Sequence, residues 1–206
     1  MKQTNLIALV TPVLIVCFMV GAGYSGLHGG SAAFEHAIYD PGNLKPKDSR
    51  LKVEIGDPAP DFTLPAVSGE HVTLSQFEGK KNVVLSFVPA AWTPVCSDQW
   101  PGYNIAKGIF DHHDTILVGI TVDNIPTLFA WTRRMTPDDS TLWFPVLSDF
   151  WPHGAVASRY GILRSDGTSE RALFVIDKKG IIRYIDVHNI NERPPLETLV
   201  RQLEKL

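Results

Sequence analysis

The sequence predicts an α/β fold in which a mixed central β-sheet is flanked by helices. Short apolar runs of β-branched and aromatic residues alternate along the chain with segments of helical pattern, as they do in layered α/β domains. Near the C-terminus, apolar runs at 173–176 and 181–187 are joined by a polar stretch at 177–180, which predicts a β-hairpin. The hairpin adds antiparallel strands to parallel ones, so the sheet should be mixed.

The first strand and the first helix of this domain have clear local signals. Residues 83–87 form a short, largely apolar run with two valines and a phenylalanine, which is typical of a buried strand. A loop follows, and Thr93 and Pro94 end it. Threonine is favoured at the N-cap of a helix and proline at the first helical position, so a helix should begin here.

The later elements follow in a regular order. The apolar run at 116–122 predicts a second buried strand, 126–135 a helix, and 144–147 a short strand. A helix at 155–160 should end at Gly161, because glycine adopts the left-handed conformation that ends many helices. The hairpin comes next, and the last element is an amphipathic helix at 195–206, whose apolar face carries Leu196, Leu199, Val200 and Leu203.

Residues 1–24 have the pattern of a transmembrane anchor or a signal peptide. Lys2 precedes a strongly apolar run at 6–20, and no charged residue occurs between positions 3 and 27. A spanning helix needs about 20 apolar residues, and residues 6–24 just reach that length. A signal peptide needs a shorter apolar run and small residues at its cleavage site, which 21–23 or 31–33 could supply. In both cases the domain should lie on the outer (periplasmic or extracytoplasmic) side, anchored to the membrane or exported after cleavage.

Residues 25–50 are expected to be a linker, because they are rich in Gly, Ser, His and Pro and show no apolar period. Residues 51–206 then form one domain of ordinary size. The net charge is −3 and no block of like charge occurs, so nothing indicates nucleic-acid binding. The two cysteines, Cys17 and Cys96, are too few for a disulfide framework or a cysteine zinc site.

Cys96 stands where the chemistry of a helix start can act on it. It should lie in the first turn after Thr93, where unpaired N–H groups and the helix dipole favour an anion. The thiolate is the nucleophilic form of cysteine, and such sites promote it. Thr93 is three residues earlier and shares the same edge of that turn. The alternative is that Cys96 is an inert buried residue, which is common for cysteine.

The pattern Pro89-x-x-x-Thr93-x-x-Cys96 resembles the active-site motif of the peroxiredoxins, the alkyl hydroperoxide reductase and thiol-specific antioxidant family. Three other stretches resemble that family in the same order: Gly56 to Leu64, Leu74 to Lys80, and Arg171 to Ile182. The likeness covers about Val53 to Val187. It implies a thioredoxin-like fold for the domain.

The resemblance also implies roles for individual residues. Cys96 would attack the peroxide and become a sulfenic acid, and Thr93 would hydrogen-bond the thiolate and the peroxide. Arg171 would favour the thiolate and orient the substrate, since arginine is a permanent cation with several donors. Pro89 would shield the site from water. Trp92 is close enough to Cys96 in the sequence to touch the substrate.

Three positions depart from the family pattern. Gln99, a further candidate for substrate contact, stands where relatives often carry a glutamate, and Val88 stands where an aromatic residue or histidine is frequent. Pro101 falls where one subfamily places its resolving cysteine. Because proline cannot donate to the Ser97 carbonyl, the helix should kink or stop there.

The expected function is a thiol-dependent peroxidase that reduces hydrogen peroxide or organic hydroperoxides without a cofactor or metal. An external thiol, either a thioredoxin-like protein or a small thiol, would regenerate Cys96, because no other cysteine follows residue 17. Many relatives form dimers, so a homodimer is compatible with the resemblance. The alternatives are a membrane-tethered thiol–disulfide oxidoreductase, which usually requires Cys-x-x-Cys, and a non-catalytic binding module on the same fold. Residues 111–114, Asp-His-His-Asp, are expected to be a solvated helix end or loop, because adjacent histidines point to different faces of a helix.

Overall fold

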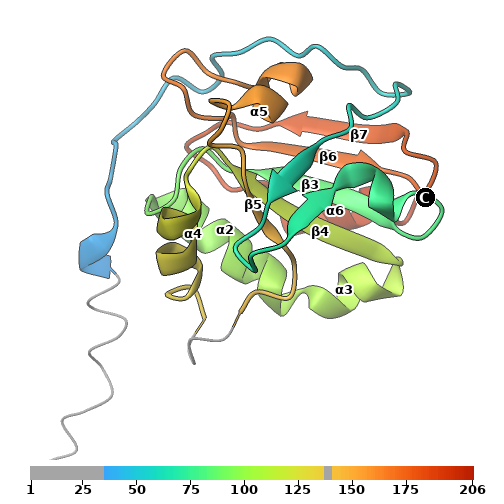
Figure 1. The fold of residues 1–206 in the computed structure, drawn as a ribbon, viewed down its shortest axis with the longest axis horizontal. Coiled ribbons are helices and arrows are strands. Elements are labelled where there is room, and N and C mark those ends of the chain that lie inside the picture. The colour runs from blue at the N-terminus through green and yellow to red at the C-terminus, as the bar shows by residue number, and fades with distance from the viewer. Residues whose placement is uncertain (1–34, 137–140) are drawn as a thin grey trace, which may run out of the picture.

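A computed structural model describes residues 35–136 and 141–206 and contains a mixed five-stranded sheet (Figure 1). The strand order is β5-β4-β3-β6-β7, with β3–β4 and β4–β5 parallel and β3–β6 and β6–β7 antiparallel. The predicted α/β fold with a mixed sheet is therefore confirmed. The strands are β3 (Asn82–Phe87), β4 (Thr115–Thr121), β5 (Val146–Ser148), β6 (Ala172–Ile176) and β7 (Ile182–Val187).

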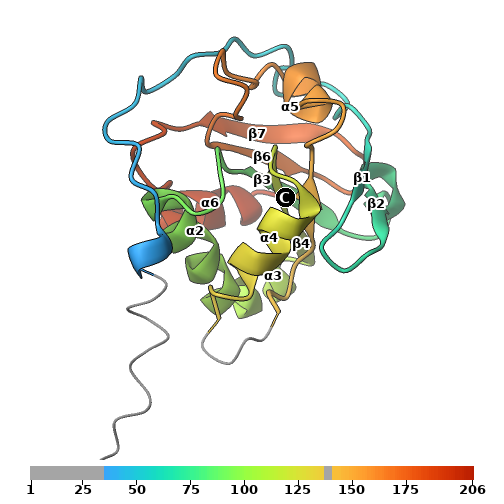
Figure 2. The same ribbon diagram turned by 60° about the vertical axis from the view of Figure 1, so that its left-hand side comes forward.

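Helices cover both faces of this sheet (Figures 1 and 2). Successive side chains of a strand point to opposite faces, so each strand contributes to the core on both sides. Val83, Leu85 and Phe87 of β3 join one apolar cluster with α5, whereas Val84 joins the other cluster. That second cluster contains the buried side chains of four helices and also Cys96. Figures 1 and 2 show the arrangement of α2 (Pro94–Ile105), α3 (Lys107–His112), α4 (Ile125–Thr132), α5 (Ala155–Tyr160) and α6 (Leu196–Leu203) around the sheet.

Most predicted elements are present with boundaries shifted by a few residues, and α5 has the predicted bounds, with Gly161 as its C-cap. Four further elements were not predicted. A two-stranded sheet of β1 (Thr63–Pro65) and β2 (His71–Thr73) is followed by a 3₁₀ turn, η1 (Leu74–Phe77). Strands of three residues are too short to show a period, and the six residues of α3 make fewer than two helical turns.

Pro101 lies inside α2, and the helix continues beyond it to Ile105. Of the two expected outcomes at this proline, a kink or a stop, the stop is therefore excluded. Trp100 and Tyr103, on either side of it, are both buried in the second apolar cluster. Tertiary packing of this helix compensates for the hydrogen bond that proline cannot make.

The described part of the expected linker at 25–50 also contacts the domain. Backbone or side-chain groups of Leu44, Lys45 and Asp48 are hydrogen-bonded to the domain. The predicted membrane anchor or signal peptide at 1–24 lies outside the described residues. Within residues 35–136 and 141–206, no helix is long and apolar enough to cross a membrane.

The backbone of Gly161 packs closely against residues 50–52, so replacing Gly161 with alanine should destabilise the protein. The φ of Gly161 is +76°, and an added Cβ would lie 2.3 Å from the Arg50 carbonyl oxygen and 2.4 Å from the Lys52 nitrogen. Backbone strain and overpacking should together lower the free energy of unfolding by about 2–4 kcal/mol, measured by chemical denaturation. Gly167→Ala is the matched control, because Gly167 has φ +84° and no atom near an added Cβ. An equal loss in both variants would contradict the close approach.

Candidate active site

Cys96 is the third residue of α2 and is fully buried. Strand β3 ends at Phe87, a loop crosses the end of the sheet, and Thr93 precedes the helix with an extended backbone (φ −112°). Pro94 takes the first helical position, as predicted. The sulfur therefore lies among the N–H groups of a helix N-terminus, where negative charge is favoured.

Sheet pairing brings Arg171 to the same place from a distant part of the sequence. Phe87, the last residue of β3, pairs with Ala172, the first residue of β6, so Arg171 lies beside the loop that leads to Cys96. The Arg171 side chain is only 2% exposed, and its Nη2 donates to the Cys96 Sγ at 3.4 Å. Without the family resemblance, the sequence would place Arg171 on the surface, because exposure is usual for arginine.

The remaining donors of Arg171 fix the guanidinium from two further directions. Its Nε and Nη2 donate to the Ile190 carbonyl at 3.2 and 3.0 Å, and its Nη1 donates to the Gln99 Oε1 at 2.6 Å. Arginine offers its donors in a rigid planar fork, so these contacts set the direction of the donor that faces the sulfur.

Gln99 is fully buried and contacts Arg171 rather than the cavity above Cys96. Its amide nitrogen donates to the Ser86 hydroxyl and the Tyr103 hydroxyl. Burial raises the pKa of Tyr103 far above its ordinary value, so this phenol stays neutral. Among the described residues, no carboxylate lies within salt-bridge distance of Arg171. The neutral amide thus holds Arg171 without cancelling its charge.

Thr93 and the loop before it are held by contacts that the sequence did not indicate. The Thr93 hydroxyl donates to the Ala90 carbonyl at 2.9 Å, so its proton is engaged by the backbone and is not directed at Cys96 as the resemblance implies. The Ala91 N–H donates to the Asp123 carboxylate at 2.8 Å, and the Ser169 hydroxyl donates to the Val88 carbonyl. Asp123 follows β4 and Ser169 precedes β6. The sheet topology alone brings both residues to this loop.

A cavity of about 670 Å³ opens above the sulfur. Cys96 and Arg171 lie at its base, and Pro89 and Thr93 form part of its wall. Trp92 does not line it, although substrate contact was expected. The Trp92 side chain packs instead against the second apolar cluster, and its backbone adopts the left-handed conformation (φ 59°). The described residues contain no group of three or more His, Cys, Asp and Glu side chains arranged to hold a metal ion.

Comparisons with known proteins identify one family. The sequence model of the AhpC/TSA family matches residues 55–185. Alkyl hydroperoxide reductase E of Mycobacterium tuberculosis is 37% identical over 141 residues, which cover 68% of this chain and 89% of that protein. The chloroplastic 2-cysteine peroxiredoxin of Chattonella marina is 32% identical over 161 residues, covering 76% and 82% respectively. A solved structure, the reduced 2-Cys peroxiredoxin of Plasmodium vivax, superposes with a TM-score of 0.67 at 29% identity, over 74% of this chain and 81% of that one.

Proposed function

Since the chain belongs to the AhpC/TSA family of peroxiredoxins and is a thiol-dependent peroxidase, we propose that it works by a one-cysteine cycle centred on Cys96. The observation that supports the proposal most strongly is the hydrogen bond from the buried Arg171 guanidinium to the Cys96 sulfur. Cys96 is also the only cysteine after residue 17. The family match argues against a non-catalytic binding module. The absence of a Cys-x-x-Cys sequence argues against a thiol–disulfide oxidoreductase.

The proposed reaction begins with a thiolate at Cys96, favoured by the helix N-terminus and by Arg171. The sulfur attacks the terminal oxygen of the hydroperoxide, so an S–O bond forms and the O–O bond breaks. The sulfur keeps the OH group as a sulfenic acid, and the alkoxide or hydroxide leaves and takes a proton from water. Arg171 donates toward the departing oxygen, Pro89 restricts access by water, and the Thr93 oxygen accepts a hydrogen bond from the peroxide.

The cycle closes through an external thiol. Several relatives are named 2-Cys peroxiredoxins, whereas the domain of this chain holds Cys96 alone. One thiol displaces water from the sulfenic acid and forms a mixed disulfide, and a second thiol then releases Cys96. Both a small thiol and a thioredoxin-like protein could supply these groups.

Oxidation of the purified protein should therefore convert Cys96 to a sulfenic acid without a disulfide bond between chains. One equivalent of hydrogen peroxide should add a single oxygen atom to Cys96, and excess should drive it to sulfinic and sulfonic acids. Intact mass and non-reducing electrophoresis measure the products. A Cys17→Ser variant should behave identically. A stoichiometric covalent dimer in that variant would show that Cys96 resolves between chains and would end the one-cysteine proposal.

We also propose that the domain lies on the outer side of a membrane or is exported, because Lys2 precedes the apolar run at 6–20. Protease added to intact cells or spheroplasts should then digest the domain, and a cytoplasmic marker protein should survive. Survival of the domain until the cells are lysed would contradict this topology.

A further inference from the structure

A strap formed by residues 39–48 lies against the active site, outside the region that the family model matches. It is the blue segment that passes from the side of α2 toward α5 in Figures 1 and 2. Its first part, residues 39–44, lines the cavity above Cys96. The sequence predicted a linker here, so this contribution to the site was unexpected.

The end of the strap nearest the cavity is tied to both sides of the catalytic centre. The Tyr39 N–H donates to the Trp92 carbonyl at 2.7 Å, next to Thr93. The Asn191 side chain brackets Leu44 by accepting from its N–H and donating to its carbonyl, each at 2.8 Å. Asn191 follows Ile190, whose carbonyl accepts from Arg171. The wall of the cavity and the catalytic guanidinium are thus held by the same loop.

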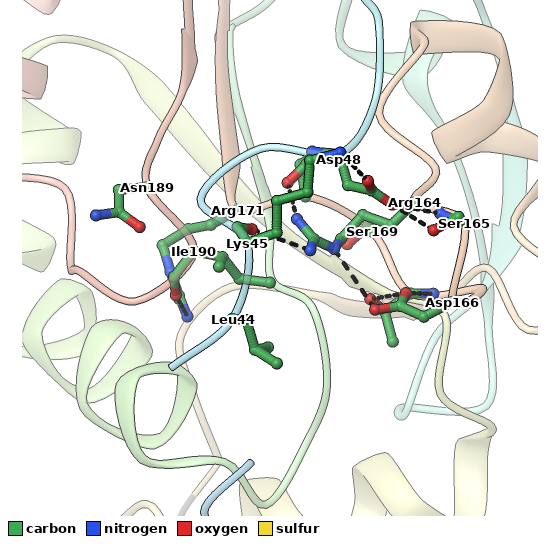
Figure 3. A network of polar contacts seen from close by, with 12 residues as sticks. Leu44, Lys45, Asp48, Arg164, Ser165, Asp166, Ser169, Arg171, Asn189 and Ile190 are labelled. Atoms are coloured by element: carbon green, nitrogen blue, oxygen red, sulfur yellow. Dashed lines mark hydrogen bonds and ion pairs between the residues drawn. The ribbon is translucent and has the colours of Figure 1, made fainter. Parts of the chain in front are cut away.

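The far end of the strap is held by buried charge. The Glu170 carboxylate is fully buried, accepts from the Asp48 N–H at 2.5 Å, and pairs with the Arg164 Nη1 at 2.7 Å. Arg164 also donates to the Lys45 carbonyl at 3.1 Å (Figure 3). Hydrogen bonds from Lys45 and Ser165 hold the pKa of Asp48 well below its usual range. Detaching the strap would leave the buried Glu170 carboxylate and the Arg164 guanidinium without these hydrogen bonds, which is costly for charged groups, so the strap is a fixed wall.

The cavity behind this wall is larger and less polar than hydrogen peroxide requires. Its volume of about 670 Å³ lies within the range of small-molecule binding sites. The strap contributes Pro41 and Leu44 to the lining, and helix α2 contributes Pro94 and Val95. Such a surface gains free energy by burying an apolar group of a substrate.

The exposed charged residues that line the cavity are both acidic. Asp40 and Asp166 both line it and are exposed, whereas Arg171 is its only cationic side chain and lies buried at the base against Cys96. Asp166 lies 3.6 Å from the Nε of Arg164, whose Nη1 pairs with Glu170, so the charge of Asp166 is partly balanced. A substrate with a carboxylate on its organic part would meet Asp40 and Asp166 and, among the described lining residues, no cation except Arg171. Repulsion of this kind is screened by salt but persists over several ångströms.

We propose that the strap completes the substrate site and that the cavity selects hydroperoxides with an uncharged, apolar organic group over those with an anionic group. The proposal rests on the peroxidase function assigned to Cys96. The strap provides the apolar wall, Asp40 and Asp166 provide the charge filter, and Arg171 engages only the peroxide.

A matched pair of substrates tests the charge filter in the full-length protein. Cumene hydroperoxide with a para-carboxylate and its methyl ester differ in charge but share the reacting group. The second-order rate of Cys96 oxidation should be about 3- to 10-fold higher for the ester at low salt, and the ratio should fall as salt is added. In the Asp40→Asn/Asp166→Asn double variant the ratio should approach that of the uncatalysed reaction with a free thiol. Asp111→Asn, on exposed α3, removes a carboxylate remote from the cavity and should keep the wild-type ratio.

The apolar wall is tested by Leu44→Ala. The rate for the ester, divided by the rate for hydrogen peroxide, should fall roughly 3- to 10-fold in this variant as apolar contact is lost. Equal rates for acid and ester in the wild type, or an unchanged ratio in the double variant, would overturn the charge filter. An unchanged ester-to-peroxide ratio in Leu44→Ala, with the fold intact by circular dichroism, would overturn the role of the strap. If hydrogen peroxide itself failed to oxidise Cys96, the proposed function would fall instead.

Discussion

Replacing Cys96 with serine is expected to abolish peroxide reduction, with a loss on the order of 10⁴-fold or more in turnover. The serine hydroxyl is not ionised near neutral pH, so it cannot replace the thiolate as nucleophile. The change is nearly isosteric, and the new oxygen can still accept from Arg171 Nη2. We therefore expect the free energy of unfolding to change by less than about 1 kcal/mol.

Peroxide consumption with dithiothreitol as reductant measures this effect, with thermal unfolding followed in parallel. Cys17→Ser is the matched control, because it makes the same chemical change outside the domain and should retain full turnover. Turnover by the Cys96→Ser protein at more than a trace of the wild-type rate would show that another group carries the reaction.

Replacing Arg171 with methionine should slow the reaction by about 10²- to 10³-fold, the usual cost of losing one donor aimed at developing charge. The loss should persist at high pH, where the thiol is ionised without help, because Arg171 also faces the departing oxygen in the proposed mechanism. Arg171→Lys keeps the charge but not the fork that reaches Cys96, Ile190 and Gln99 together, so it should recover only part of the rate.

The pH dependence of the second-order rate constant with hydrogen peroxide separates the two actions of Arg171. A rate in Arg171→Met that rises to the wild-type value at high pH would mean that the guanidinium acts on ionisation alone. Methionine leaves the Ile190 carbonyl and the Gln99 amide oxygen without their donor, which should cost about 1–3 kcal/mol of stability. Denaturation therefore accompanies the kinetic measurements.

The parts of this site that the sequence predicts are those with local signals. Thr93, Pro94 and the apolar run before them were enough to place Cys96 at the start of a helix. Arg171 could be placed beside it only through the family resemblance, because its position depends on the pairing of Phe87 with Ala172 across the sheet. Gln99 was assigned to the substrate, but no local pattern shows which face of α2 meets Arg171.

The strap was missed for a related reason. Its composition is that of a linker, and the groups that hold it, Glu170, Arg164 and Asn191, lie more than a hundred residues away in the chain. The burial of Glu170, one position before Arg171 in the sequence, has no signature there, since acidic residues are almost always exposed. The same holds for β1 and β2, whose pairing depends on contacts with the rest of the domain and not on their own three residues.

Because Gln99 is neutral, the charge of Arg171 would be balanced only when the Cys96 sulfur is itself an anion. In the thiolate form, Arg171 faces an anion, and its buried charge is balanced. In the sulfenic acid form the sulfur is neutral, and among the described residues no carboxylate takes its place. A sulfinate would be an anion again and would restore the balance. In the proposed one-cysteine cycle, Arg171 would therefore favour the thiolate and the sulfinate over the sulfenic acid between them. Such an enzyme would stay active only where an external thiol reduces the sulfenic acid faster than a second peroxide oxidises it.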